Sequence, residues 1–151
     1  MSHLIYLIQV WGGCSQYLIK MIQILQNRAA RTVTKSSWYT SIPELLNQCN
    51  WLSVNQLIVF HDILLVFKIR KDKKPVHLYN KLSSEYNYRT RYSINNEIRQ
   101  THIPKSEIYE SSFVHRAVSA WNALPTEITN MSEIHKFKSN LRNWVKNNVD
   151  I

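Results

Sequence analysis

The stretch SVNQLIVFHDILLVFKI, residues 53–69, decides the fold of this 151-residue chain. Ser53 and Gln56 stand three positions apart, which is the spacing of a capping box at the start of a helix. Apolar residues then occupy nearly every side of the helix, so it belongs at the centre of the core. A basic cluster followed by Pro75 is expected to end it near Ile69.

Outward from this stretch, the rest of the chain also favours helices. Glycine occurs twice and proline four times, which leaves few places for tight turns. Further helices are predicted over residues 18–33, from Ser41 through Leu46, from Val114 to Trp121, and from Ser132 onward. Trp51, Trp121 and Trp144 are expected to lie in the core.

The segment 83–112 is polar and shows no clear period, so it is predicted to be a long arm or a partly extended loop. The length of the chain suits one domain with a real core. We therefore expect a mainly α fold, an irregular helical bundle in one domain over residues 1–151, from which the arm 83–112 extends.

The helix predicted over residues 18–33 has an apolar and a basic face. The apolar stripe comprises Leu18, Ile22, Leu25, Ala29 and Val33, and the opposite side comprises Lys20, Asn27, Arg28, Arg31 and Lys35. Leu25 and Ala29 are expected to dock on the central helix. Arg28, Arg31 and Lys35 are predicted to follow a phosphate backbone, with an ordinary solvated helix face as the alternative.

The charge of the chain points to an anionic partner. Lysine and arginine number 19 against 10 aspartates and glutamates, a net charge of +9 with a pI near 9.7. Residues 68–91 hold eight basic residues against Asp72 and Glu85, so 8 − 2 = +6 lies in this segment. This balance favours nucleic acid over a membrane surface.

Two parts of this segment are predicted to contact nucleic acid. The end of the central helix carries Lys68, Arg70, Lys71, Lys73 and Lys74, more cations than the helix dipole alone would explain. Farther along, tyrosines 86, 88 and 92 alternate with arginines, and the predicted contacts there are Tyr88, Arg89 and Arg91. Stacking on these rings suits a single-stranded partner; the alternative is a surface loop whose tyrosines pack on the domain edge.

No catalytic, metal, cofactor or small-molecule site is predicted. Cys14 and Cys49 are too few for a disulfide framework and fit a reducing compartment. The six histidines lack the spacing of paired metal ligands, and His61 is expected to be a hydrogen-bonded core residue. The apolar run Leu4–Val10 is too short to span a bilayer, so no membrane association is expected.

Several short motifs occur in an order that resembles one known family. They are Trp11-Gly12, Leu25-Gln26-Asn27-Arg28-Ala29-Ala30-Arg31, Trp51-Leu52-Ser53, Phe67-Lys68-Ile69, Tyr88-Arg89-Thr90-Arg91, Ser112-Phe113, Trp121-Asn122-Ala123-Leu124-Pro125 and Phe137-Lys138. This set resembles the region that follows the polymerase domain in non-LTR (LINE-type) retrotransposon reverse transcriptases, and it covers nearly the whole chain.

The resemblance implies a thumb-like and post-thumb segment, the remnant of an RNA-directed DNA polymerase, beside an adjoining polymerase domain. The catalytic chemistry does not carry over, because the chain lacks the clustered aspartates that hold two metal ions. We expect a non-catalytic protein that binds RNA or DNA, single-stranded or hybrid, in the nucleus or cytoplasm. The alternative is a helical protein-interaction or structural remnant without a nucleic-acid role.

Overall fold

The chain folds into a bundle of helices, seen in a computed structural model that describes residues 2–82, 98 and 106–150. In chain order the helices are α1 (Ser2–Ile5), α2 (Ile8–Trp11), α3 (Gln16–Thr34), α4 (Ile42–Gln48), α5 (Val54–Asp72), α6 (Val76–Leu82), α8 (Glu107–Glu110), α9 (Phe113–Asn122), α10 (Thr126–Thr129) and α11 (Ile134–Asn148). These described ranges contain no strand, and the predicted mainly α fold is confirmed.

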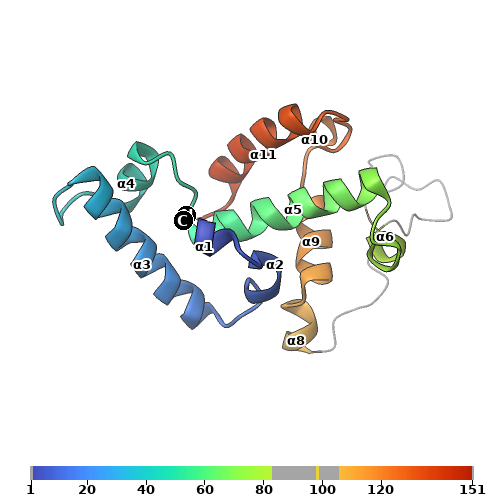
Figure 1. The fold of residues 1–151 in the computed structure, drawn as a ribbon, viewed down its shortest axis with the longest axis horizontal. Helices are drawn as coiled ribbons and strands as arrows, with labels where there is room; N and C mark the ends of the chain where they lie inside the picture. Colours follow the sequence, from blue (N-terminus) through green and yellow to red (C-terminus); the bar gives the residue numbers. More distant parts are fainter. Residues whose placement is uncertain (1, 83–97, 99–105, 151) are drawn as a thin grey trace.

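Helix α5 is the central element, as its sequence predicts (Figure 1). It begins with a complete capping box: the Ser53 hydroxyl accepts from the Gln56 amide at 3.2 Å, and Gln56 Oε1 accepts from the Ser53 amide at 3.1 Å. It packs against α9, α11 and α6, and also against α2 and α3. Because neighbours surround α5, apolar residues are needed on nearly all of its sides.

The larger of two apolar clusters joins α5 to α9 and α11. The rings of Phe67 and Phe137 stack with their centroids 4.1 Å apart, and Trp121 lies 6.2 Å from Phe137. Trp121 is buried as predicted, whereas Trp51 and Trp144 are half-buried. The second cluster joins α2, α3 and the first half of α5 through Ile8, Ile19, Leu52, Val54, Leu57 and Ile58.

The predicted orientation of α3 is wrong. Leu25 is 61% exposed, and Leu18, Ala29 and Val33 are exposed as well. The residues of α3 that are buried are Ile19, Gln26 and Ala30. The helix carries apolar residues on two sides, and the side that faces the core also holds glutamines, which apolar periodicity alone does not count.

Two glutamine side chains attach α3 to the start of α5. Gln26 Nε2 donates to the carbonyl of Leu52 at 2.8 Å, and the Val54 amide donates to Gln23 Oε1 at 2.7 Å. Gln23 Nε2 in turn donates to Gln26 Oε1 at 2.9 Å and to Asn27 at 2.8 Å. Gln23 thereby satisfies one of the amides that a helix N-terminus leaves without an internal partner.

The predicted arm 83–112 needs correction where it can be compared with the structure. Ile98 is buried, and its backbone forms two hydrogen bonds with the Asn122 side chain: Ile98 N donates to Oδ1 at 2.8 Å, and Nδ2 donates to Ile98 O at 2.9 Å. Residues 107–110 form helix α8, and Ser112 caps α9. Burial of Ile98 and local capping explain the difference; residues 83–97 and 99–105 lie outside the described residues.

Candidate nucleic-acid interface

The three cations predicted on α3 lie toward its C-terminal end, but they differ in their surroundings. Arg28 and Lys35 are exposed, and Lys35 ends the helix in the left-handed region with φ of 52°. Arg31 is half-buried, and its guanidinium carbon lies 4.6 Å from the centroid of the Trp38 ring. Among the described residues Arg31 Nε is shielded from solvent and has no hydrogen-bond partner. Arg31 therefore supports the ring of Trp38.

Two aromatic side chains project into solvent beside these cations. Trp38 is 70% exposed and Tyr39 is 95% exposed, in the loop between α3 and α4. In the sequence this pair follows no helical period, so the pattern is consistent with either a core position or an exposed stacking surface. The two adjacent aromatics after a basic helix were the only signal in the sequence. We call Arg28, Arg31, Lys35, Trp38 and Tyr39 the aromatic platform.

The segment that carries the aromatic platform is basic, and the next carboxylate along the chain is Glu44 in the first turn of α4, which packs against α3. Residues 1–43 contain four cations, Lys20 and the three of the platform, and no aspartate or glutamate. No carboxylate from this part of the chain therefore competes with an incoming phosphate. Exposed rings beside cations offer stacking for bases and charge for a phosphate backbone, which is the combination that single-stranded nucleic acid requires.

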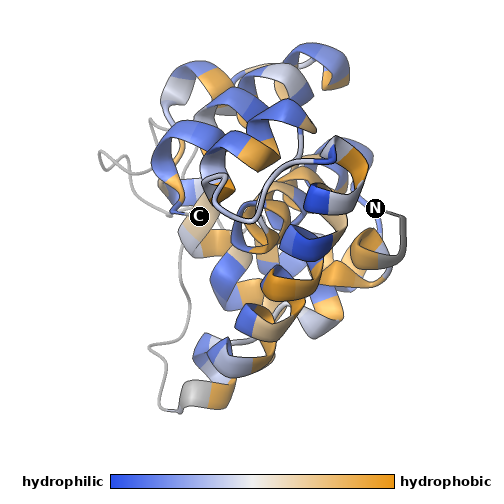
Figure 2. Cartoon of the chain, turned by 90° about the vertical axis from the view of Figure 1, so that its left-hand side faces the viewer, coloured by the Kyte–Doolittle hydropathy of each residue, from blue (hydrophilic) through white to orange (hydrophobic). Residues whose placement is uncertain are grey.

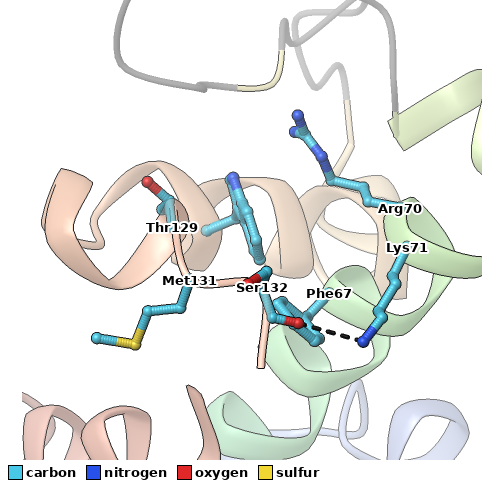
Figure 3. Close-up of a pocket in the computed structure, with 7 residues that line it drawn as sticks. Phe67, Arg70, Lys71, Thr129, Met131 and Ser132 are labelled. Carbon is cyan, nitrogen blue, oxygen red and sulfur yellow. Dashed lines mark hydrogen bonds between the residues drawn. The ribbon is translucent and has the colours of Figure 1, made fainter. Parts of the chain in front are cut away.

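The five cations predicted at the end of α5 have different surroundings in the structure. Lys68, Lys73 and Lys74 are exposed. Arg70 is half-buried, with its guanidinium carbon 5.4 Å from the centroid of the Trp121 ring. Lys71 Nζ donates to the carbonyl of Ser132 at 3.2 Å, which holds the end of α5 against the start of α11 (Figure 3).

A cavity of about 230 Å³ lies at this end of α5. Figure 3 shows the side chains of Arg70 and Lys71 at its edge. The lining residues are Phe67, Arg70, Lys71, Trp121, Thr129, Met131 and Ser132. Arg70 and Lys71 thus have structural contacts, although Lys71, like Lys68, Lys73 and Lys74, is exposed to solvent.

The structure separates the nucleic-acid contacts predicted on α3 from those predicted at the end of α5. The C-terminal ends of α3 and α5 lie at opposite ends of the molecule in Figure 1. Tyr88, Arg89 and Arg91 lie outside the described residues, and their contact with nucleic acid stays a prediction. The aromatic platform and the end of α5 are therefore two separate basic surfaces.

A third basic row, on α11, contacts the turn after α4. The sequence favours a solvated face for Lys138, Arg142 and Lys146. In the structure Arg142 Nη2 donates to the carbonyl of Asn50 and lies 3.3 Å from its Oδ1, and Lys146 Nζ lies 3.3 Å from the same oxygen. Cations near the last carbonyls of a helix are stabilising, so Arg142 and Lys146 help to hold α11 against this turn.

His61 faces part of this row from α5. Burial lowers the pKa of His61, and the nearby charges of Lys68 and Lys138 lower it further. Its ring is half-buried and forms an edge-on contact with Phe60, with centroids 5.3 Å apart. The predicted core histidine is therefore a partly exposed, neutral one.

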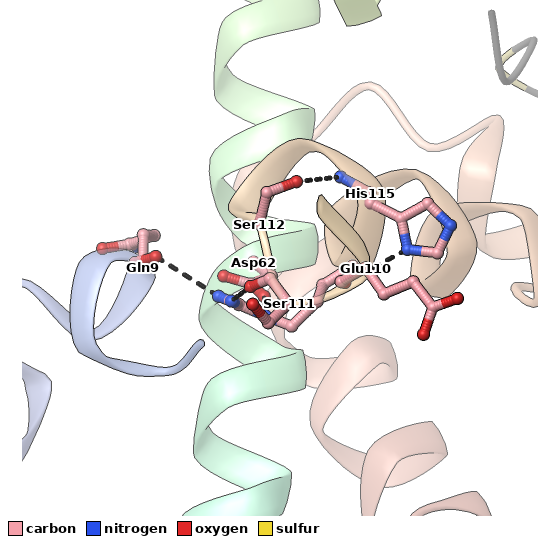
Figure 4. A network of polar contacts seen from close by, with 7 residues as sticks. Gln9, Asp62, Glu110, Ser111, Ser112 and His115 are labelled. Carbon is pink, nitrogen blue, oxygen red and sulfur yellow. Dashed lines mark hydrogen bonds and ion pairs between the residues drawn. The ribbon is translucent and has the colours of Figure 1, made fainter. Parts of the chain in front are cut away.

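A polar network around Arg116 joins α9 to α5 and α2 (Figure 4). Arg116 Nε lies 3.2 Å from Asp62 Oδ2, Nη2 donates to Gln9 O at 3.2 Å, and Nη1 donates to Ser111 O. Asp62 Oδ1 is buried without a hydrogen-bond partner among the described residues. Burial raises the pKa of Asp62 to about 6, although the charge and hydrogen bond of Arg116 oppose this.

The same network explains the Gly12-Gly13 pair. A Cβ on Gly13 would meet the backbone carbonyl of Ser111 first and would lie 2.7 Å from Arg116 Nη1, and one on Gly12 would lie 2.6 Å from the carbonyl of Ile8. The backbone and the guanidinium approach each other too closely for a side chain at either position. The motif Trp11-Gly12 therefore has a packing role.

Within the ranges that the structure describes, no group of histidine, cysteine, aspartate and glutamate side chains is arranged to hold a metal ion. In the same ranges no helix is both long enough and apolar enough to cross a bilayer. No family model, curated protein or solved structure matches this chain.

Proposed function

We propose that this chain is a non-catalytic protein that binds single-stranded RNA or DNA through the aromatic platform. The observation that carries the proposal is the exposure of Trp38 and Tyr39 directly beside Arg31, Arg28 and Lys35. Large aromatic side chains are normally at least half-buried in a folded domain. Here two such residues, Trp38 and Tyr39, are consecutive and exposed, and the guanidinium of Arg31 contacts the ring of Trp38.

The geometry favours a single strand over a duplex. Bases in a duplex are already stacked on one another, so their faces are not available to protein rings. In a single strand each base can stack on an exposed ring, which contributes roughly 1–3 kcal/mol. Every base has a face that can stack on these rings, so we expect weak dependence on base sequence.

The origin of the chain belongs to the same proposal. The ordered motifs favour descent from the region after the polymerase domain of a non-LTR retrotransposon reverse transcriptase, acting in the nucleus or cytoplasm. In-frame coding sequence for a polymerase palm, upstream of Met1 in the genomic DNA, would support this origin. Unrelated coding sequence there would contradict it without affecting the binding proposal.

The binding test uses the full chain and labelled oligonucleotides in fluorescence anisotropy. We expect affinity for single-stranded RNA or DNA above that for a duplex of equal length, and a fall in affinity with added salt, because neutralised phosphates release counterions. Trp38→Ala with Tyr39→Ala should weaken binding about tenfold or more. Arg28→Gln with Lys35→Gln should also reduce the salt dependence.

Matched variants separate the platform from general charge. Tyr6→Ala replaces another exposed tyrosine and should leave affinity unchanged. Lys73→Gln with Lys74→Gln removes the same charge as the Arg28 and Lys35 pair from the opposite end of the molecule. Equal losses for the two charge pairs, with no loss for the aromatic pair, would leave only a diffuse charge effect and contradict the platform.

A further inference from the structure

The exposed apolar side chains are concentrated in one part of the molecule. Of the fourteen large apolar side chains that are exposed among the described residues, twelve lie between residues 5 and 39. Six of these lie on α3, and five of the six are in its N-terminal half: Tyr17, Leu18, Met21, Ile24 and Leu25, each at least 45% exposed. We call these five the outer stripe.

The outer stripe is a continuous face of α3. Met21 stands three or four residues from each of the other four members, which places it beside all of them on the helix surface. Ile19, Gln26 and Ala30, the buried residues of α3, lie on the other side and contact the rest of the bundle. Figure 2 turns this end of the molecule toward the viewer, and apolar residues, in orange, recur along the helices there.

Such a face marks an interaction site. Monomeric proteins rarely expose contiguous apolar patches above about a few hundred Å² unless the patch binds something. Apart from Tyr17 the members are Leu18, Met21, Ile24 and Leu25, which provide neither the charge nor the flat ring that a nucleic acid recognises. The outer stripe therefore has a different partner from the aromatic platform.

The charge around the outer stripe decides the kind of partner. Lys20 lies along one edge and Arg28 at the C-terminal end, and residues 1–43 contain no carboxylate. A second copy of the chain would place cations against cations. We propose that the outer stripe binds an amphipathic helix of a protein partner, with an apolar stripe of its own that is flanked by aspartate or glutamate. Burial of apolar side chains contributes the affinity. The acidic residues beside the apolar stripe of the partner determine which helix binds and in which orientation.

The test uses three synthetic helical peptides with the full chain. The first has leucines at helical spacing flanked by glutamates, the second has the same leucines flanked by lysines, and the third has the composition of the first in scrambled order. We expect binding of the first peptide alone, measured by anisotropy of a peptide label. Met21→Ser with Leu25→Ser should weaken it at least about tenfold.

Control variants test whether the loss of peptide binding is specific to the outer stripe. Val76→Ser with Ile108→Ser changes two exposed apolar residues elsewhere and should leave the affinity for the peptide unchanged. Lys20→Glu should weaken the binding of the glutamate-flanked peptide and strengthen the binding of the lysine-flanked peptide. Met21 and Leu25 are exposed, so their variants should fold, which circular dichroism can verify. These variants should retain binding to single-stranded RNA, so failure of the docking proposal can be distinguished from failure of the platform.

Three outcomes would overturn the proposal. The first is equal binding, or no binding, of the glutamate- and lysine-flanked peptides. The second is a dimer in sedimentation velocity that Met21→Ser with Leu25→Ser dissociates, which would make a second copy the occupant. The third is binding to anionic lipid vesicles that the same variant abolishes while the peptides do not bind, which would make the stripe a lipid contact.

Discussion

The guanidinium of Arg116 on α9 and the carboxylate of Asp62 on α5 form an ion pair, with 3.2 Å between Nε and Oδ2. Only one carboxylate oxygen is paired, and the other is buried without a partner in the described part of the chain. A half-satisfied buried carboxylate costs free energy in its charged form. This pair therefore joins two core helices and also makes their stability depend on pH.

The first prediction concerns the proton on Asp62. Burial raises its pKa from 3.8 to about 6, so the folded protein binds this proton more tightly than the unfolded chain does. The contribution of Asp62 to stability should be complete below about pH 4 and lost as the pH rises through about 6. The free energy of unfolding of the natural chain relative to Asp62→Asn should fall by about 1–3 kcal/mol over this interval.

Urea unfolding at several pH values between 4 and 7 measures this difference. His61 acts in the opposite sense, because its lowered pKa makes the folded state lose stability as the pH falls below 6.5. Comparison with Asp62→Asn cancels the histidine contribution, which both proteins share. A difference that stays flat, or that grows with pH, would contradict the raised pKa.

The second prediction concerns Gly13. Gly13→Ala should destabilise the fold by about 1–3 kcal/mol, because the new Cβ would lie 2.7 Å from Arg116 Nη1 and the backbone or the guanidinium would have to move. Thermal unfolding of the variant measures the loss. Ala29→Ser, at an exposed position of α3, should change stability by less than about 0.5 kcal/mol. Equal stability of both variants would argue against the close approach.

The third prediction concerns Asn122. Its side chain forms both hydrogen bonds to the backbone of Ile98, so Asn122→Ala should leave a buried amide and carbonyl unpaired. We expect a loss of about 1–3 kcal/mol in the free energy of unfolding. Hydrogen exchange at the Ile98 amide should also accelerate. Asn143→Ala, at an exposed position of α11, serves as the control, and similar exchange at Ile98 in both variants would contradict the contact.

The fourth prediction concerns the polar attachment of α3. Gln26→Leu conserves approximate size but removes the donor to the Leu52 carbonyl, so it should destabilise the fold by about 1–3 kcal/mol despite the greater apolarity of leucine. Gln16→Leu, at an exposed position of the same helix, should have little effect. Greater stability of Gln26→Leu, as apolar periodicity alone would predict, would show that the hydrogen bond contributes little.

The starts of α4 and α5 could be predicted from the sequence because their signals are local. Ser53 and Gln56 form their capping box within one turn. Ser41 and Pro43 mark the start of α4 by position, although the Ser41 side chain forms no cap hydrogen bond with the described residues. The central position of α5 followed from apolar residues on nearly every side. The burial of Trp121 was predicted for the same reason, since it lies on the apolar stripe of a short helix.

The orientation of α3 could not be predicted, because a partner distant in the sequence decides it. Gln23 and Gln26 bind backbone groups of Val54 and Leu52, which lie 31 and 26 residues away. A hydropathy pattern treats these glutamines as solvent-facing. Leu18 and Leu25 of the predicted apolar stripe belong instead to the outer stripe, whereas Ile22 packs against the second apolar cluster.

The sequence by itself determined five of the helical segments, where α4 and α5 begin, and that α5 lies at the centre, since these depend on capping and on apolar periodicity within one segment. The tertiary structure decided where the short helices α1, α2, α6, α8 and α10 form, which face of α3 is buried, which of the described cations are exposed and where Ile98 is held. Those outcomes depend on hydrogen bonds and packing between residues far apart in the chain, and no local pattern encodes their geometry.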